Sequence, residues 1–484
     1  MHRPTPADLR TSPIGRRDFL RAGGGFGTLA LAGLLADEAR AQGTPSSTQA
    51  DPLAPKPPHF PARAKRVIFL FMTGGVSHVE SFDPKPKLEA DHGKTVTIDN
   101  WQGRPGNYNF TLKRPIFPSQ RGGKCGTEVS DLFPHIRGVV DDLCVIRSMT
   151  TDHTNHYEST LGMHTGSFNF ARPSVGAWAS YGLGTENRNL PSFVVVAPSS
   201  PYAGAQTWGS DFLPGCHQGT HITPGRTPIA DLARLSPTAE LQRLELELIA
   251  NANQRHLADR SADAALEARI RSFETAFGMQ SAAPEVFDLS GETDETLALY
   301  GLQRGQTTGF GWQCLVARRF AERGVRFIEL IDTGSSGNAA IHFNWDAHGD
   351  METHAPLAKN VDQAIAALVA DLKRTGMLDD TLVVWTTEFG RTPYHSDPNA
   401  KGREHHHQVF SSWMAGGGIK GGIVHGSSDE YGIAVAEDKV HVHDFHATIL
   451  HQLGIDHERL TYRHAGRDYR LTDVSGRVVK EILA

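Results

Sequence analysis

The chain has 484 residues, of which 39% are hydrophobic and 21% charged, and its formal net charge at pH 7 is −6. This length suits one large α/β domain or two to three smaller domains. Because the chain carries no excess of positive charge, its composition argues against nucleic acid as a partner. Histidine is abundant, at 25 residues, and is the commonest metal ligand, which is a first indication of metal chemistry.

The N-terminal segment has the pattern of an export signal. A twin-arginine run, GRRDFL at residues 15–20, precedes a stretch of small residues and leucines at 22–36 and an A-x-A cleavage site at 39–41. As a helix, about 15 residues would reach only about 22 Å, less than the ~30 Å hydrocarbon core of a bilayer. We therefore predict that residues 1–41 are a signal peptide read by the Tat translocase. The mature chain should have no membrane span and should be periplasmic or secreted.

Residues 42–64 are rich in Pro, Ser and Ala, which predicts a disordered linker. Beyond it, five short apolar runs between turn signals are typical of strands buried on both faces of a sheet. These runs are 66–72, 143–149, 193–197, 325–331 and 382–387. Helical patterns alternate with them, at 237 onward, 262–277, 310–323, 356–375 and 444–453. The alternation predicts one α/β domain over residues 65–484, with a mainly parallel sheet covered by helices on both faces.

Two of these helices carry specific predictions. The helix from Pro237 has Ser236 as its N-cap and apolar positions at Leu241, Leu244 and Leu248. Asp444 reads best as the N-cap of a helix over 445–453 rather than as part of a histidine cluster.

Functional groups in such sheets gather in the loops that leave the carboxyl ends of the strands. Four of the predicted strands are followed by loops rich in His, Asp, Glu or hydroxyl residues: 73–89, 150–166, 342–356 and 388–408. The four cysteines are widely spaced and form no C-x-x-C pair, which argues against a zinc–thiolate cluster. One disulfide or four separate thiols remain alternatives.

The loop at 342–356 contains Asp346, His348, Asp350 and His354, a set that suits Zn, Mn or Fe. The alternative is a polar loop with a helix N-terminus, where acidic residues are favoured.

The loop at 388–408 offers two further features. Glu388 follows an apolar strand directly, so its carboxylate needs either a cation or hydrogen bonds, with an ion pair to Arg391 as the alternative. If the run His405-His406-His407 is extended, its side chains alternate and at most two can address one ion. The alternative for the run is a solvated polar loop.

The loop at 150–166 places hydroxyl groups, including Thr154, among histidines at the start of a probable helix. Free N–H groups there would hold an anion, and a hydroxyl could become a nucleophile. An ordinary Thr/Asn N-cap is the alternative.

Several of these stretches resemble the domain of unknown function 1501 family: GGVSHVESFDPKP, NWDAH, TEFGRTP, GREHHHQ and the closing stretch from VHVHDFH onward. That family is thought to be similar in fold to alkaline phosphatases, sulfatases and phosphoglycerate mutases. The resemblance implies a metal site with the ligands Asp83, Asp346, His348, His354, Glu388 and His405. It places Phe389 where relatives carry a second ligand, so one of two metal sites is altered or missing. It gives no clear nucleophile, because the matching position falls near His156 and the nearest hydroxyl is Thr154.

Two hypotheses follow from this resemblance. In the first, the protein is an exported hydrolase of phosphate or sulfate esters, acting on a small anionic ester or a sulfated or phosphorylated glycan. Its divalent metal is zinc, with manganese or calcium as alternatives. Thr154 or water attacks, His156 acts as acid or base, and Arg391 steadies the anion. In the second, the protein is a non-catalytic envelope protein that keeps the fold and a metal.

Overall fold

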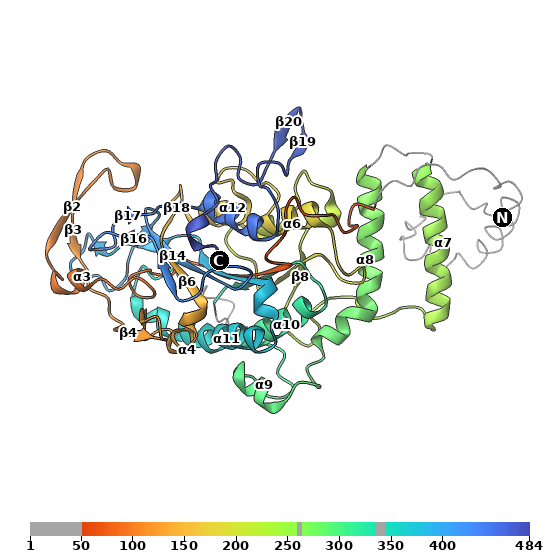
Figure 1. Ribbon diagram of the computed structural model, residues 1–484, viewed down its shortest axis with the longest axis horizontal. Coiled ribbons are helices and arrows are strands. Elements are labelled where there is room, and N and C mark those ends of the chain that lie inside the picture. The colour runs from red at the N-terminus through yellow and green to blue at the C-terminus, as the bar shows by residue number, and fades with distance from the viewer. Residues whose placement is uncertain (1–50, 259–263, 335–343) are drawn as a thin grey trace, which may run out of the picture. The chain divides into compact units, whose positions relative to one another are not determined.

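The computed structural model describes residues 51–258, 264–334 and 344–484 (Figure 1). The predicted signal peptide lies outside these residues, so export remains a prediction. Residues 51–64 of the predicted linker are described, and they pack against the domain: Lys56 N donates to the Leu183 carbonyl and Ala64 N to the Gln452 carbonyl. Among the described residues, no helix combines the length and the apolar character needed to cross a bilayer.

A large sheet forms the centre of the domain, and its middle strands are parallel, which confirms the predicted fold class. The parallel set, in spatial order, is β10 (Thr381–Thr387), β1 (Arg66–Met72), β9 (Phe327–Asp332), β7 (Phe193–Val196) and β8 (Thr220–Ile222). Beyond β10 lie β14 (Phe410–Ala415), β6 (Leu143–Thr150), β15 (Ile423–His425) and β18 (Val440–His441). Only β14 runs antiparallel to its neighbours, so β6 is again parallel to β10. The carboxyl ends of β6, β9 and β10 therefore share one edge.

Helices cover both faces of this sheet (Figure 1). One face packs on α4 (Pro134–Gly138), α10 (Phe310–Glu322) and α11 (His354–Arg374), and the other on α6 (Val175–Leu183) and α12 (Val442–Gln452). Side chains of β1 alternate between the two cores: Ile68, Leu70 and Met72 enter the first, and Val67, Phe69 and Phe71 the second. A strand buried on both faces reads as a continuous apolar run for this reason.

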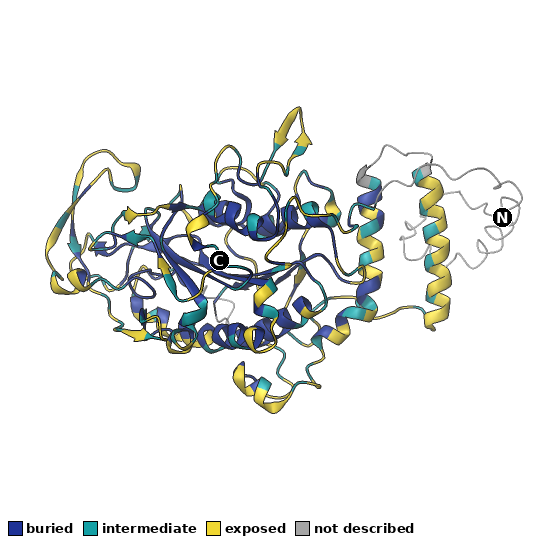
Figure 2. Cartoon of the chain, in the orientation of Figure 1, coloured by how far each residue is buried: buried dark blue, intermediate teal, exposed yellow. Residues whose placement is uncertain are grey.

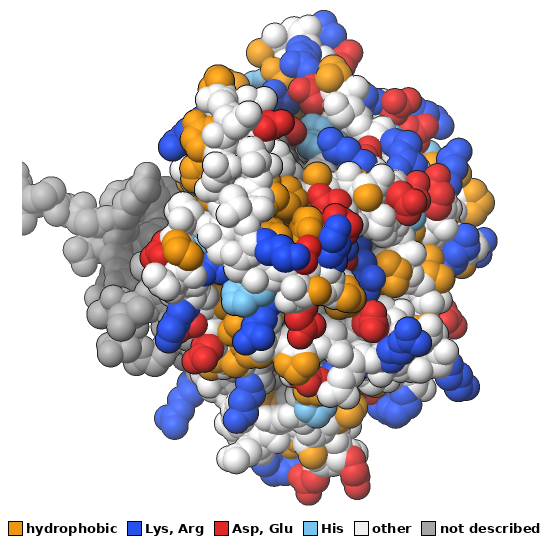
Figure 3. Space-filling view, turned by 90° about the vertical axis from the view of Figure 1, so that its left-hand side faces the viewer, with side chains coloured by type: hydrophobic (Ala, Val, Ile, Leu, Met, Phe, Trp, Pro, Cys, Tyr) orange, Lys and Arg blue, Asp and Glu red, His pale blue; other side chains and the backbone are white. Residues whose placement is uncertain are grey.

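Smaller elements surround the sheet. The remaining helices are α3 (Pro86–Ala90), α5 (His156–Thr165), α7 (Ala239–Ala258), α8 (Ala264–Phe287) and α9 (Asp294–Leu299). The small sheets are β2 (Thr95–Asp99) and β3 (Asn107–Leu112) with β12 (Tyr394–His395), β4 (Ser119–Gly122) with β5 (Thr127–Ser130), β11 (Gly390–Arg391) with β13 (His405–His406), β16 (Ser427–Ser428) with β17 (Val435–Glu437), and β19 (Tyr462–His464) with β20 (Arg467–Tyr469). On the face at the β2–β3 end, positive and negative side chains are interspersed (Figure 3). All four cysteines are free, which settles the disulfide question.

Two helices differ from the prediction at their ends. Helix α7 begins at Ala239 rather than Pro237, because the Thr238 hydroxyl accepts a hydrogen bond from Leu241 N at 3.1 Å and caps the helix. Helix α12 begins at Val442, with His441 as its N-cap and Asp444 completing a capping box inside the first turn.

Several histidines are buried as neutral side chains with one hydrogen-bond partner each. Burial lowers the pKa of His78, His217, His406 and His446 to about 3. His446 Nε2, for example, lies 2.7 Å from the Met163 carbonyl, to which it donates. These rings cannot accept a second proton without placing a charge in the core.

We predict that stability falls steadily as the pH decreases from about 6.5 towards 3. The unfolded chain binds protons at these histidines below its ordinary pKa of about 6.5, whereas the folded chain does not. Each buried ring therefore costs about 1.4 kcal/mol of unfolding free energy per pH unit in this window. Urea unfolding at pH 7, 6 and 5 measures the slope. His446→Gln should reduce the slope and the exposed-site control His464→Gln should not; equal slopes would contradict the assignment.

Candidate metal centre

Four side chains from three loops meet at the carboxyl edge of the sheet. They are His156 at the start of α5, Asp346 and His348 between β9 and α11, and His405 in β13. One ligand atom from each lies within 4.8 Å of those of the other three. The loops that carry them leave β6, β9 and β10, whose carboxyl ends share one edge of the sheet, which is where parallel sheets place functional groups.

The Asp346 carboxylate is the centre of the group, and all three imidazoles turn their Nε2 atoms towards it. Its Oδ1 lies 3.1 Å from His348 Nε2 and 3.4 Å from His405 Nε2, and its Oδ2 lies 3.2 Å from His156 Nε2. The Nε2 atoms of His348 and His405 are only 2.8 Å apart. His156 Nε2 is buried and has no hydrogen bond of good geometry among the described residues.

The opposite nitrogen of each ring, Nδ1, faces an oxygen acceptor. These pairs are His156 with Glu388 Oε1 at 2.8 Å, His348 with Glu404 Oε2 at 3.1 Å, and His405 with the Thr154 carbonyl at 2.6 Å. A carboxylate or a carbonyl can only accept, so Nδ1 carries the hydrogen in all three rings. Nε2 of each ring is therefore the position that either a second proton or a metal ion can occupy, and three such nitrogens converge on one carboxylate. Such an outer partner on each ring is the usual support of a metal-binding histidine.

The electrostatics of the site strongly favour positive charge at this point. The carboxylates of Asp346 and Glu404 raise the pKa of His348 to about 9. Burial lowers the pKa of His156, but its contacts with Asp346 and Glu388 outweigh this and the pKa is raised. Burial would raise the pKa of Asp346, yet the imidazoles and Arg391 hold it well below its ordinary value. Three converging Nε2 atoms beside an ionised carboxylate form a chemically suitable site for a divalent cation.

Arg391 supports this carboxylate from behind. Its guanidinium is fully buried and donates to Asp346 Oδ1 at 2.6 Å, to the Gly75 carbonyl at 3.0 Å and to the Gly74 carbonyl. Gly74, with φ +117°, lies so close to Asp346 that a Cβ atom would come within 2.6 Å of Asp346 N. The Thr-Gly-Gly turn after β1 thus makes room for the loop that carries Asp346. The guanidinium N–H groups of Arg391 donate to acceptors inside the protein.

Glu388 lies behind the cluster rather than inside it. Its fully buried carboxylate accepts hydrogen bonds from Gly74 N at 2.7 Å, His156 Nδ1 at 2.8 Å and the Thr387 hydroxyl at 3.0 Å. Hydrogen bonds therefore compensate its burial. The alternative, an ion pair between Glu388 and Arg391, is not found, because Arg391 pairs with Asp346 instead.

The structure does not bring Asp83 or His354 to the cluster. Asp83 pairs with Lys85 at 3.0 Å and accepts a hydrogen bond from the Ser428 hydroxyl. His354 accepts from Ser77 N at 3.3 Å, packs edge-on against Trp345, and burial holds its pKa well below the ordinary value. Both side chains contact neighbours that sequence spacing does not reveal.

The Thr154 carbonyl contacts His405, whereas no contact of its hydroxyl with the cluster is found among the described residues. The N-cap of α5 is Asn155, whose side chain accepts from Tyr157 N. His406 points away from His405 and lies 2.8 Å from the Ile433 carbonyl, as the alternation along an extended run predicts. One of the three histidines therefore reaches the cluster.

Two aromatic rings wall the site. Phe389 packs against His405 and His156, with ring centroids 4.5 and 4.9 Å apart. Tyr202, in the segment after β7, stacks on His156 at 4.1 Å and is 38% exposed. Tyr202 and the supporting role of Glu404 were not predicted from the sequence. The available signals were a tyrosine after a strand end for Tyr202 and a carboxylate next to His405 for Glu404.

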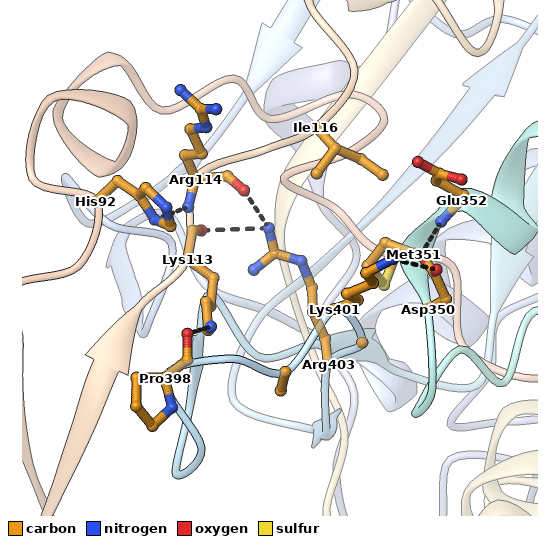
Figure 4. A pocket seen from close by; sticks show the side chains of 12 residues that line it. His92, Lys113, Arg114, Ile116, Asp350, Met351, Glu352, Pro398, Lys401 and Arg403 are labelled. Atoms are coloured by element: carbon orange, nitrogen blue, oxygen red, sulfur yellow. Dashed lines mark hydrogen bonds and ion pairs between the residues drawn. The ribbon is translucent and has the colours of Figure 1, made fainter.

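A cavity of about 340 Å³ adjoins the segments that carry His348 and His405 (Figure 4). Gly402 lines it and lies against the His348 carbonyl. Arg403 donates to Glu80 at 2.7 Å and to the carbonyls of residues 113 and 114, while Glu80 also accepts from residue 116 N. The buried Glu80–Arg403 pair thus joins one wall of the cavity to the strand of His405.

The cavity wall carries positive charge. Lys113 is 8% exposed, and its ammonium donates to the Pro398 carbonyl at 2.5 Å (Figure 4). Burial lowers the pKa of Lys113, and no carboxylate of the described residues lies within 4.0 Å of it. Arg114 and Lys401 also line the cavity and are exposed, and the Lys401 ammonium lies 3.9 Å from the Asp350 carboxylate.

Known proteins that match this chain are solved structures and one family model. Solved structures that the chain matches include the lipoteichoic acid synthase LtaP from Listeria monocytogenes (8% identity, 87% of this chain and 79% of that chain, TM-score 0.35), the phosphonate monoester hydrolase SpPMH from Silicibacter pomeroyi (13%, 72% and 71%, 0.33) and the alkaline phosphatase of the Antarctic bacterium TAB5 (14%, 73% and 92%, 0.28). Proteins of curated function gave no match. A family model described as a protein of unknown function, DUF1501, matches residues 64–483. The chain therefore belongs to the DUF1501 family, as its motifs predicted.

Proposed function

We propose that this protein is an exported, metal-dependent hydrolase of phosphate or sulfate esters, with a divalent cation held by His156, Asp346, His348 and His405. One observation carries the proposal: three imidazoles with fixed Nδ1–H groups direct their Nε2 atoms at one ionised carboxylate, where a divalent cation would replace the protons on Nε2. The ligand set is narrower than the one implied by family resemblance, since Asp83, His354 and Glu388 have other partners.

Zinc is the cation that this donor set favours. Three imidazole nitrogens and one carboxylate oxygen match its usual four-coordinate sites. Calcium takes six to eight oxygens, and manganese prefers carboxylate- and water-rich sites, so both suit this cluster less well. When bound, such a cation polarises an ester oxygen and lowers the pKa of a water molecule.

The contacts of the neighbouring residues indicate their roles in the proposed reaction. Arg391 orients and neutralises Asp346, so it is a positioning residue rather than the group that holds the substrate anion. Because the Thr154 carbonyl and not its hydroxyl faces the cluster, water is the favoured nucleophile. The basic side of the cavity next to His348, which carries Lys113 and Arg114, supports an anionic substrate. A small anionic ester or a sulfated or phosphorylated glycan fits this chemistry.

A second candidate is a non-catalytic envelope protein that binds the same cation. Phe389 favours it, because its ring packs on two of the ligand histidines where relatives carry a second metal ligand. A metal-loaded protein without turnover on any ester would identify this function.

We predict that the purified protein binds one divalent cation, with zinc preferred, and that Asp346→Asn or His405→Ala abolishes binding. Each removes a donor from a four-residue set, so little affinity remains. Elemental analysis after dialysis measures the stoichiometry. His407→Ala is the matched control, because His407 lies two residues from His405 but outside the cluster. Unchanged metal content in Asp346→Asn would overturn the site.

We predict that Glu404→Gln weakens zinc binding about 10–100-fold without abolishing it, because the outer partner of a ligand histidine sets its basicity and orientation. Competition titration with a chelating dye measures the change. Glu352→Gln, an exposed acid in the same region, should leave the affinity unchanged. Equal affinities for Glu404→Gln and the wild type would show that Glu404 does not orient His348.

We predict that p-nitrophenyl phosphate or p-nitrophenyl sulfate is hydrolysed by the zinc-loaded protein. Chelator should remove the activity and added zinc should restore it. Asp346→Asn should lower kcat/KM at least 100-fold, whereas Thr154→Val should retain activity if water is the nucleophile. Metal binding without turnover across a broad ester panel would favour the non-catalytic function instead.

A further inference from the structure

The exposed apolar side chains of this protein are concentrated on one helical hairpin. Fourteen large apolar side chains of the described residues are exposed, and six of them lie on α7 and α8. They are Leu241, Leu244, Leu248 and Ile249 of α7 and Phe273 and Phe277 of α8, with exposed fractions between 39% and 65%. Figure 2 shows α7 exposed along most of its length. An apolar patch of this kind marks a surface that another molecule covers.

The apolar stripe predicted for α7 is present, and its leucines are exposed in this chain on its own. None of the residues 239–257 is buried. The helix touches α8 through Gln242, whose amide donates to Gln280 at 2.6 Å, and an apolar cavity of about 280 Å³ lies between the two helices. A helix with an apolar stripe at i, i+3 and i+7 gains most of its stability from packing that stripe against a neighbour.

The size of the hairpin suits a second copy of itself. Helix α7 has 20 residues and is about 30 Å long at ~1.5 Å per residue. Two helices about 9 Å apart present roughly 500–600 Å² per copy, so two hairpins bury roughly 1,000–1,200 Å². That is about the minimum for a specific interface.

The charge pattern also favours a second copy. The first half of α7 holds three acidic residues and one basic residue (Glu240, Arg243, Glu245 and Glu247), with Arg243 paired to Glu247, and Arg255 lies in its last half. Two copies of α7 packed antiparallel about a twofold axis would place each acidic half against the basic half of the other. The acidic residues beside the leucines oppose an anionic membrane surface, which basic helices prefer.

We propose that α7 and α8 form a homodimer interface, in which two hairpins pack as a four-helix bundle about a twofold axis near Leu248. The interface is isologous, so each copy contributes the same leucines and the same charges. It involves no residue of the metal centre and does not depend on the proposed function.

The oligomeric state of the full chain tests the interface. Sedimentation velocity over a micromolar concentration series should show a dimer for the wild type. Leu244→Glu combined with Leu248→Glu should weaken the dimer at least 100-fold, and both sites are exposed, so the fold is retained and thermal melting confirms it. Val474→Glu, at an exposed apolar site away from the hairpin, should leave the dimer unchanged. A monomeric wild type, or a dimer that survives the double substitution, would overturn the proposal.

Cross-linking tests the twofold axis directly. In a Cys125→Ser background, which removes the exposed cysteine, Leu248→Cys should form a disulfide-linked dimer on mild oxidation. Val474→Cys should not. Binding of the wild type to phosphatidylglycerol vesicles that is lost in the double glutamate variant would assign the surface to a membrane and overturn the dimer.

Discussion

The Asp346 carboxylate is the interaction around which the site is organised. It is ionised because three imidazoles and the Arg391 guanidinium surround it, and those rings point their Nε2 atoms inward because oxygen acceptors hold every Nδ1 hydrogen. The acceptors come from two loops far apart in sequence: Thr154 from the loop at 150–166, and Glu388 and Glu404 from the loop at 388–408. The fold of the whole sheet edge, and not a local motif, therefore sets the protonation pattern that makes the cluster suitable for a cation.

Most of the sheet could be predicted from the sequence, because strands buried on both faces are continuous apolar runs. Strand β1 matches the prediction at both ends, and four others differ by one or two residues. Strand β14 was missed because Ser411 and Ser412 interrupt its apolar pattern; the Ser412 hydroxyl lies 2.7 Å from that of Thr386 and is satisfied inside the core. The leucines of α7 show what such a pattern leaves open. A helical pattern indicates an apolar face, but it does not indicate which molecule covers that face.

For the site, the sequence predicted which loops meet but not which atoms reach the centre. Asp346, His348 and His405 lie in motifs whose spacing suggested ligands, and all three reach the cluster. Glu388 lies at the expected strand end. Its carboxylate accepts hydrogen bonds from Gly74 N and His156 Nδ1, so it contacts a histidine of the cluster and not the centre of the cluster. Such distinctions depend on the path of the Gly74–Gly75 turn, which residue type and spacing do not specify. The position of Tyr202 depends on the path of the loop after β7, which a tyrosine at a strand end does not specify.

The Glu80–Arg403 pair couples two parts of the molecule that an engineer would wish to vary separately. Arg403 is two residues from His405, and through Glu80 and two carbonyls it also holds the cavity wall at residues 113–116. A library that reshapes this wall will therefore shift the strand that carries His405. Selections for an altered cavity should accordingly recover compensating changes around Arg403, or disturb the histidine–aspartate cluster as their first side effect.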